Sequence, residues 1–253
     1  MIGYSTFGRG PARAIVLHGW FGDETSLEGI YPALDPEQLT LACMAYRGYG
    51  ASRDMKGQFT LDEIGRDALD LADHLGWDRF HAVGHSMGGM AVQWLAAHAT
   101  TRIISGIAIT PVPAGGFPMD DGSWALFAGA ADSADNRAAI INFTTGQRHN
   151  AAWLATMVAK SLSNSTREAF AAYLLAWAKT DFSERARGIM TPLKVLVGEH
   201  DLAVTPDFMR ATILAWFPRA EMEVIPNAGH YPMNETPVSL ADAMQAYMYL
   251  KGM

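Results

Sequence analysis

The heptapeptide VGHSMGG, residues 83–89, is the most informative stretch of this 253-residue chain. The apolar run Phe80–Val83 precedes it and the alanine-rich amphipathic run Met90–Ala99 follows it, which predicts a strand, a sharp turn and a helix. Glycines on both sides of Ser86 let the strand and the helix approach closely, so that the turn can lift the serine hydroxyl above the sheet. The first amides of the helix point toward the same place and suit an oxyanion. Ser86 is therefore the candidate nucleophile, and a purely capping serine is the alternative.

A second polar motif follows another apolar run. Residues Leu193–Val197 are β-rich, and the sequence GEHDLAV that continues from them puts Asp201 on the loop just past the predicted strand. A carboxylate at that position can orient an imidazole ring. Glu199 lies on the same loop and is the alternative acid, but the spacing from the end of the strand favours Asp201.

A third motif supplies a histidine. The strand-like run Met222–Ile225 leads into PNAGHYPM, which puts His230 in a Gly/Pro loop before the last predicted helix. The chain order Ser86, Asp201, His230 is the order expected when all three side chains project from the carboxyl ends of strands in one parallel sheet. A structural loop histidine is the alternative for His230.

Strand-like and helical patterns alternate along most of the chain, which predicts an α/β fold with a mostly parallel central sheet and helices on both faces. The predicted strands are residues 14–17, 39–44, 80–83, 103–109, 193–197 and 222–225. The predicted helices outside the region discussed next are residues 60–75, 90–99, 205–216 and 236–250. The spacing of Thr60 and Glu63 is that of a capping box.

One long region, between Ile109 and Leu193, interrupts this alternation with helical runs rich in aromatic residues and methionine. It predicts a helical cap of residues 112–188, inserted into a core of residues 1–111 and 189–253. Some of its side chains are candidates for lining an apolar substrate cleft, and packing of the cap onto the core is the alternative for each of them. The candidates are Phe143, Trp153, Met157, Tyr173 and Trp177.

Together, the motifs LHGWFG, RGYGAS, VGHSMGG, GEHDLAV and NAGHYP resemble the α/β-hydrolase superfamily over nearly the whole chain. The resemblance implies that the cap follows the sixth strand of that fold, and that the backbone amides of Trp20 and Met87 form the oxyanion hole. It also implies that His18 braces the oxyanion loop. The His-Gly-Trp opening is similar to bacterial carboxylesterases, including the pimeloyl carrier-protein methyl ester esterases. One departure is Ala45, which stands where the family usually has an aspartate and leaves Arg47 in need of another partner.

These residues predict a serine esterase that cleaves small to medium apolar or aromatic carboxylic esters through an acyl-enzyme on Ser86. The same triad also serves lactonases, thioesterases, carbon–carbon hydrolases, acyltransferases and hydroxynitrile lyases, so these activities stay open. A ligand receptor that keeps the fold without sustained turnover is an alternative from a different class.

Composition bounds the partners and the setting of the protein. The net charge of −7 argues against nucleic acid as a partner, since its phosphates need a basic surface. The spacing of the histidines suggests no metal site, and we expect no cofactor. The single cysteine, Cys43, excludes an intrachain disulfide, and no segment resembles a leader or a membrane span, so we expect a cytoplasmic protein without a membrane partner. The short segment before residue 14 leaves an exposed sheet edge, so we expect a monomer or a homodimer.

Overall fold

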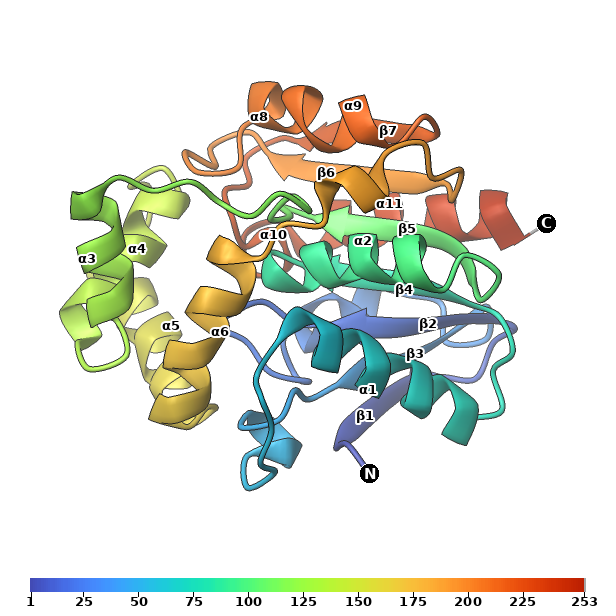
Figure 1. The fold of residues 1–253 in the computed structure, drawn as a ribbon, viewed down its shortest axis with the longest axis horizontal. Helices are drawn as coiled ribbons and strands as arrows, with labels where there is room; N and C mark the ends of the chain where they lie inside the picture. The colour runs from blue at the N-terminus through green and yellow to red at the C-terminus, as the bar shows by residue number, and fades with distance from the viewer. Residues whose placement is uncertain (253) are drawn as a thin grey trace.

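The structure, a computed structural model that describes residues 1–252, is built on one seven-stranded sheet (Figure 1). The strands are β1 (Tyr4–Gly8), β2 (Ala12–Leu17), β3 (Leu39–Met44), β4 (Phe80–His85), β5 (Ile103–Ile109), β6 (Leu193–Gly198) and β7 (Ala220–Ile225). They lie in the order β1-β3-β2-β4-β5-β6-β7. Only β1 runs antiparallel to its neighbour, and the other pairs are parallel. The α/β fold with a mostly parallel sheet is therefore confirmed.

The helices fall into those outside the connection between β5 and β6 and those within it. The first group consists of the short 3-10 helices η1 (Glu28–Ala33) and η2 (Gly50–Ser52), then α1 (Leu61–His74), α2 (Met87–His98), α8 (Pro206–Ala211), α9 (Ile213–Trp216), α10 (Pro232–Glu235) and α11 (Pro237–Gly252). The second group consists of α3 (Asp121–Gly129), α4 (Ala134–Thr144), α5 (Ala151–Ser163), α6 (Arg167–Lys179) and α7 (Ser183–Ala186).

Alternate side chains of each inner strand enter two different hydrophobic cores. In β2, Ile15 and Leu17 join the cluster that contains the buried residues of α1 and α2, whereas Ala14 and Val16 join the cluster that contains those of η1 and α11. This is the period-two alternation of a strand that is buried on both faces. Figure 1 accordingly shows α1 and α2 on the near face of the sheet and α11 on the far face.

The predicted strands are all present, and most of them are one or two residues longer than predicted. The edge strand β1 was not predicted, because its five residues are half-exposed and end at Gly8, which leaves no apolar run to detect. The helical region follows β5, the fifth strand of this chain, in which a single strand precedes β2. The predicted helix over residues 205–216 is in fact two helices that meet at Thr212.

Helices α3, α4 and α5 gather beyond one end of the sheet, and α6 lies at the same end (Figure 1). Arg137 of α4 holds the helices between β5 and β6, the cap, together. It is 2% exposed and donates hydrogen bonds to the carbonyls of Ala130 and Ser161, and its Cζ atom lies 3.7 Å from the centre of the Phe170 ring. The division into a core and a cap of residues 112–188 stays a prediction.

Arg47 pairs with the carboxylate of Asp67, because Ala45 stands where the family usually has an aspartate. Its guanidinium donates two hydrogen bonds of 2.8 Å to the carboxylate of Asp67, from Nε to Oδ2 and from Nη2 to Oδ1. Asp67 lies on α1, and Glu63, one turn earlier, is 3.6 Å from the same Nε atom. The loop after β3 is thus held by a helix instead of by its own residue.

Candidate active site

The turn between β4 and α2 holds Ser86 in a strained conformation. Its φ of 54° and ψ of −113° lie outside the regions that a residue with a side chain prefers, and such strain survives only where the surroundings impose it. Here the Ser86 amide donates to the carbonyl of Ile109 at 2.9 Å, and the Ser86 carbonyl accepts from Val112 at 3.1 Å. The end of β5 therefore fixes the turn from the neighbouring strand.

The two glycines that flank Ser86 at two-residue spacing are required for close approach. A Cβ atom on Gly84 would lie 2.1 Å from the carbonyl oxygen of Gly88, and one on Gly88 would lie 2.1 Å from that of Leu17. Both obstacles are backbone atoms, which cannot move aside as a side chain can. The pattern that pointed to Ser86 in the sequence thus has a steric cause.

Ser86, His230 and Asp201 form a continuous chain of hydrogen bonds. The distance from Ser86 Oγ to His230 Nε2 is 2.9 Å, and the distance from His230 Nδ1 to Asp201 Oδ2 is 2.6 Å. The other carboxylate oxygen of Asp201 accepts from the amides of Ala203 and Val204, both at 2.9 Å, so the carboxylate cannot rotate freely. Asp201 is 3% exposed and His230 is 8% exposed. The arrangement suits an imidazole that carries its proton on Nδ1 and can accept another on Nε2.

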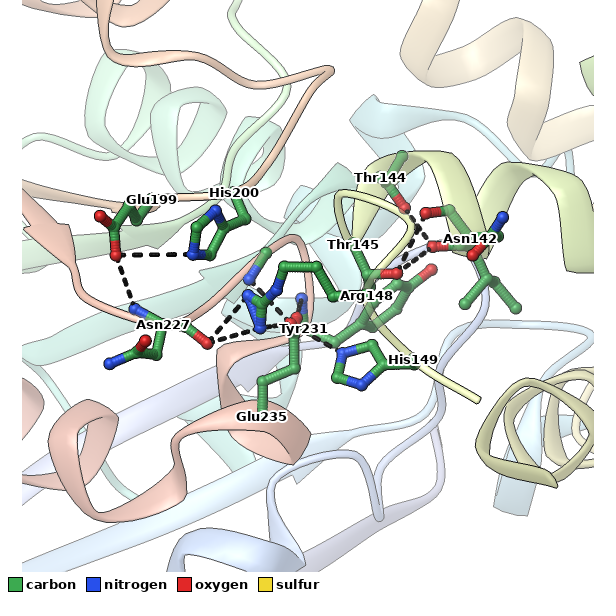
Figure 2. Close-up of polar contacts among 12 residues, drawn as sticks. Asn142, Thr144, Thr145, Arg148, His149, Glu199, His200, Asn227, Tyr231 and Glu235 are labelled. Atoms are coloured by element: carbon green, nitrogen blue, oxygen red, sulfur yellow. Dashed lines mark hydrogen bonds and ion pairs between the residues drawn. The ribbon is translucent and has the colours of Figure 1, made fainter. Parts of the chain in front are cut away.

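Glu199, the alternative acid, faces away from this chain. Its carboxylate is half-exposed, accepts a hydrogen bond from the Asn227 amide at 2.9 Å and lies 3.6 Å from His200 Nε2 (Figure 2). Asp201 and not Glu199 is therefore the carboxylate that contacts the imidazole of His230.

The loop that carries Trp20 lies beside Ser86. A Cβ atom on Gly19 would be 3.3 Å from Ser86 Cβ, which shows how closely the two backbones approach. Within residues 1–252, the amides of Trp20 and Met87 donate to no protein acceptor. Both predicted oxyanion donors are thus available, next to the serine, to a ligand oxygen.

The side chain of Trp20 ties this loop to α6. Its indole Nε1 donates to the carbonyl of Phe170 at 2.7 Å, and its ring stacks on the Phe170 ring with centroids 4.1 Å apart. The Trp20 carbonyl accepts from the hydroxyl of Tyr49 at 2.9 Å. The backbone around the predicted oxyanion amide is fixed from two sides.

His18 and His85 support the site as neutral rings. The Nδ1 atom of His18 donates to the Gly19 carbonyl at 2.8 Å while its Nε2 accepts from the Tyr46 amide at 3.2 Å, and this pairing requires one proton on the ring. Burial lowers the pKa of His18 to about 4. Burial, together with the charge of His230, lowers the pKa of His85 to about 3, and His85 Nε2 donates to the His230 carbonyl at 2.7 Å. His18 braces the loop of Trp20, as predicted.

A mostly apolar pocket opens onto Ser86 and His230. Its volume is about 50 Å³, which is small beside the ~300–1,000 Å³ of many ligand pockets. Its apolar walls come from the loop of Trp20, from the residues after β5 and from the cap. The principal side chains are Trp20, Phe21, Phe117, Phe127, Ile140 and Trp177.

Of the five predicted substrate contacts, only Trp177 lines this pocket. Met157 lines a separate, neighbouring pocket that shares Phe21, His85 and Tyr231 with the first. Sequence reasoning missed Phe117 and Phe127. Phe117 follows the glycine-rich segment after β5, and its place just beyond the end of a sheet strand is the signal that could have found it.

Tyr173, Phe143 and Trp153 line neither pocket. Tyr173 is fully buried, and its ring packs against those of Tyr46, Tyr49 and Phe59 between α6 and the core. Phe143 is 45% exposed on α4 and lines neither pocket. Trp153 stacks on His149, with ring centroids 4.0 Å apart, outside both pockets. Helical spacing identified an aromatic-rich face on each helix but not whether that face meets the core, the cleft or solvent.

Among the residues that the structure describes, no three His, Cys, Asp or Glu side chains are grouped so that they could hold a metal ion. In the same part of the chain, every helix is too short or too polar to cross a lipid bilayer.

The comparison with known proteins agrees with this architecture. The sequence model of the α/β hydrolase fold matches residues 15–237, and the chain therefore belongs to the α/β-hydrolase fold family. Hydrolysis is the general activity that this membership supports.

Individual relatives cover nearly the whole chain. The 3-oxoadipate enol-lactonase 2 of Acinetobacter baylyi is 26% identical over 256 residues, which span 98% of this chain and 92% of that protein. Among solved structures, an esterase from Thermogutta terrifontis superimposes with a TM-score of 0.85 at 22% identity, over 100% of this chain and 94% of its own. The enol-lactonase of Burkholderia xenovorans LB400 gives a TM-score of 0.81 at 24% identity, over 98% and 96%. At these identities, the two structural matches concern the fold alone.

Proposed function

We propose that the protein is a serine hydrolase that cleaves carboxylic esters of small apolar substrates through an acyl-enzyme on Ser86. The observation that carries this proposal is the unbroken chain of hydrogen bonds from Ser86 through His230 to Asp201. In the first step, Ser86 Oγ attacks the ester carbonyl and His230 Nε2 takes the serine proton. Asp201 stabilises the imidazolium that forms, and the amides of Trp20 and Met87 donate to the tetrahedral oxyanion.

The same groups complete the acylation and then carry out the deacylation. The imidazolium of His230 donates its proton to the departing alcohol oxygen, which leaves the acyl group on Ser86. A water molecule then gives a proton to His230 Nε2 and attacks the acyl carbonyl. The imidazolium returns that proton to Ser86 Oγ as the bond from Oγ to the acyl carbon breaks and the acid is released. The small, mostly apolar pocket favours a short acyl group or a compact ring.

A lactone is the second candidate substrate, since a lactone is a cyclic carboxylic ester. The observation that favours it is the full-length similarity to an enol-lactonase. A lactone suits the pocket because its acyl and alcohol parts form one compact molecule.

The test compares the native protein with Ser86→Ala on p-nitrophenyl esters from acetate to long acyl chains and on a series of small lactones, with acid release followed by pH-stat. We expect turnover that is highest for the shortest acyl chains, and a loss of about 10⁴-fold or more in kcat in Ser86→Ala. The matched control is Ser163→Ala, at an exposed serine that ends α5. This control should keep native activity.

Labelling with a fluorophosphonate distinguishes the remaining alternatives. Mass spectrometry should find the label on Ser86 alone. Labelling without sustained turnover on any ester or lactone would favour the ligand receptor. The absence of both labelling and turnover would rule out Ser86 as a nucleophile.

A further inference from the structure

The carboxylate of Glu235 contacts the backbone of the loop that carries His230. The Glu235 side chain is completely buried at the end of α10. Its Oε2 accepts from the amide of Gly229 at 2.9 Å, and its Oε1 accepts from the amide of Tyr231 at 3.0 Å. One carboxylate thus binds the two residues that flank His230.

The remaining backbone groups of His230 are also held. Its amide donates to the carbonyl of Thr144, the last residue of α4, at 3.0 Å. Its carbonyl accepts from His85 Nε2 at 2.7 Å and from Thr110 Oγ1 at 3.1 Å. Three successive amides, at positions 229, 230 and 231, are therefore bound by Glu235 and by the end of α4.

Two residues between α4 and α5 reach the same carboxylate. His149 Nε2 lies 3.0 Å from Glu235 Oε2, and Arg148 Nη2 lies 3.4 Å from it (Figure 2). Arg148 also donates to the carbonyl of Asn227, with its two terminal nitrogens at 2.8 and 3.1 Å. The cap segment thus contacts the histidine loop on both sides of Gly229.

The cost of burial argues for a specific task of this carboxylate. A buried carboxylate is stable only when it is well paired, and an apolar side chain of similar size would fill the same space at a lower cost in desolvation. What an apolar side chain cannot do is accept hydrogen bonds from two amides at once. Those two hydrogen bonds fix the direction in which the chain enters and leaves His230.

We propose that Glu235 is a positioning residue for His230, and that Arg148 and His149 of the cap hold Glu235 in place. The proposal rests on the proposed function, since it assumes that the imidazole of His230 transfers the proton of Ser86. A shift of the imidazole by about 1 Å can cost about 10²-fold in rate. Loss of the carboxylate should therefore act on the chemical step more than on substrate binding.

The first test is Glu235→Gln, with Glu199→Gln as the matched control. Glutamine keeps the volume, but its amide nitrogen cannot accept a hydrogen bond, so one of the two loop amides loses its partner. We expect kcat to fall about 10–100-fold while KM changes less than about threefold. The control removes a carboxylate that binds another amide of the same loop, that of Asn227, and it should leave kcat unchanged.

A spectroscopic measurement makes the test independent of turnover. The proton between His230 Nδ1 and Asp201 Oδ2, which are 2.6 Å apart, should give a far-downfield proton resonance. We expect Glu235→Gln to shift or broaden this signal, whereas Glu199→Gln leaves it in place. An unchanged signal together with an unchanged kcat in Glu235→Gln would overturn the proposal. If Ser86→Ala kept its turnover, the proposed function would fail while this resonance still tested the role of Glu235.

A second variant, His149→Ala, tests the link to the cap and serves if Glu235→Gln does not fold. This variant leaves both loop amides on Glu235 but removes a cap contact, so we expect a loss of about 2–10-fold in kcat. Because the two residues act through one contact, the double variant should lose no more than Glu235→Gln alone. Losses that multiply would show that His149 and Glu235 act separately and would refute the link.

Discussion

Buried neutral histidines make the stability of this protein sensitive to acid. Burial, with a contribution from the charge of Arg79, lowers the pKa of His81 to about 4, and its Nδ1 is hydrogen-bonded to Ser105 Oγ at 2.8 Å. In the unfolded chain, an ordinary histidine binds its proton near pH 6.5. Between these two values the unfolded state binds more protons than the folded state, so the free energy of unfolding falls as the pH falls from about 6.5 to about 4.

Replacement of His81 should therefore reduce the acid sensitivity. For a single histidine with this shift, the loss between pH 7 and pH 5 is about 2 kcal/mol. We expect the urea-unfolding free energy of His81→Gln to fall by about 2 kcal/mol less over this range than that of the native protein. Equal losses in the two proteins would mean that His81 does not resist protonation in the fold.

At the residue scale, the sequence was sufficient to predict the candidate catalytic side chains that follow the ends of strands. Ser86, Asp201 and His230 each follow a recognisable apolar run, and parallel strands bring their carboxyl ends to one edge. Glu235 was not predicted as a functional residue, because nothing in the sequence PMNE of residues 232–235 distinguishes a buried carboxylate from an exposed one. Its role depends on the fold of a loop, which has no periodicity to interpret.

At the scale of elements, the contact between α1 and α2 depends on a missing side chain. A Cβ atom on Gly65 of α1 would lie 2.1 Å from the ring of Trp94 of α2, and Trp94 is 7% exposed. Alanine favours a helix over glycine by about 1 kcal/mol, but the collision with a buried ring outweighs this gain. We expect Gly65→Ala to lower the free energy of unfolding by about 1–3 kcal/mol in urea denaturation.

Gly122 of α3 provides the opposite control. An added Cβ atom there would have its nearest neighbour, Asp120 Oδ1, at 3.7 Å, which is an ordinary contact. Gly122→Ala should therefore stabilise the protein by up to about 1 kcal/mol. If Gly65→Ala were also stabilising, the two helices would have to be farther apart than the structure has them.

Elements with a long, regular pattern could be predicted, and short or irregular ones could not. The strands Leu39–Met44 and Ile103–Ile109 were predicted with their observed bounds, because apolar residues dominate each run. Between β5 and β6, the sequence predicted helical segments around residues 138–143, 151–162 and 166–178 but not α3, which has nine residues, none of them buried. The break at Thr212 was not predicted, because threonine does not by itself end a helix. The break is visible only in the backbone, where Thr212 has a φ of −118° and a ψ of −93°.

At the scale of the whole molecule, one hydrophobic cluster extends from the sheet into the cap. The same group of buried residues includes Ile15 and Leu17 of β2 and Phe170, Tyr173 and Trp177 of α6. A cap that shares its core with the sheet has no separate core that could unfold first. We expect a single unfolding transition, with coincident midpoints by far-UV circular dichroism and by tryptophan fluorescence.

Fluorescence is a fair probe of the cap because three tryptophans, at positions 124, 153 and 177, belong to its helices. A fluorescence transition at lower urea than the circular dichroism transition would contradict the shared core. It would indicate that the cap unfolds independently of the sheet.

The contact between the Trp20 indole and the Phe170 carbonyl has a consequence for protein engineering. Exchange of the helices between β5 and β6 for those of another protein would change the pocket that they line. Such a graft would also remove the acceptor that anchors Trp20, and with it one support of the predicted oxyanion amide. A chimera with a different cap must therefore carry over an equivalent of Phe170, or the loop of Trp20 will keep only its anchor to Tyr49.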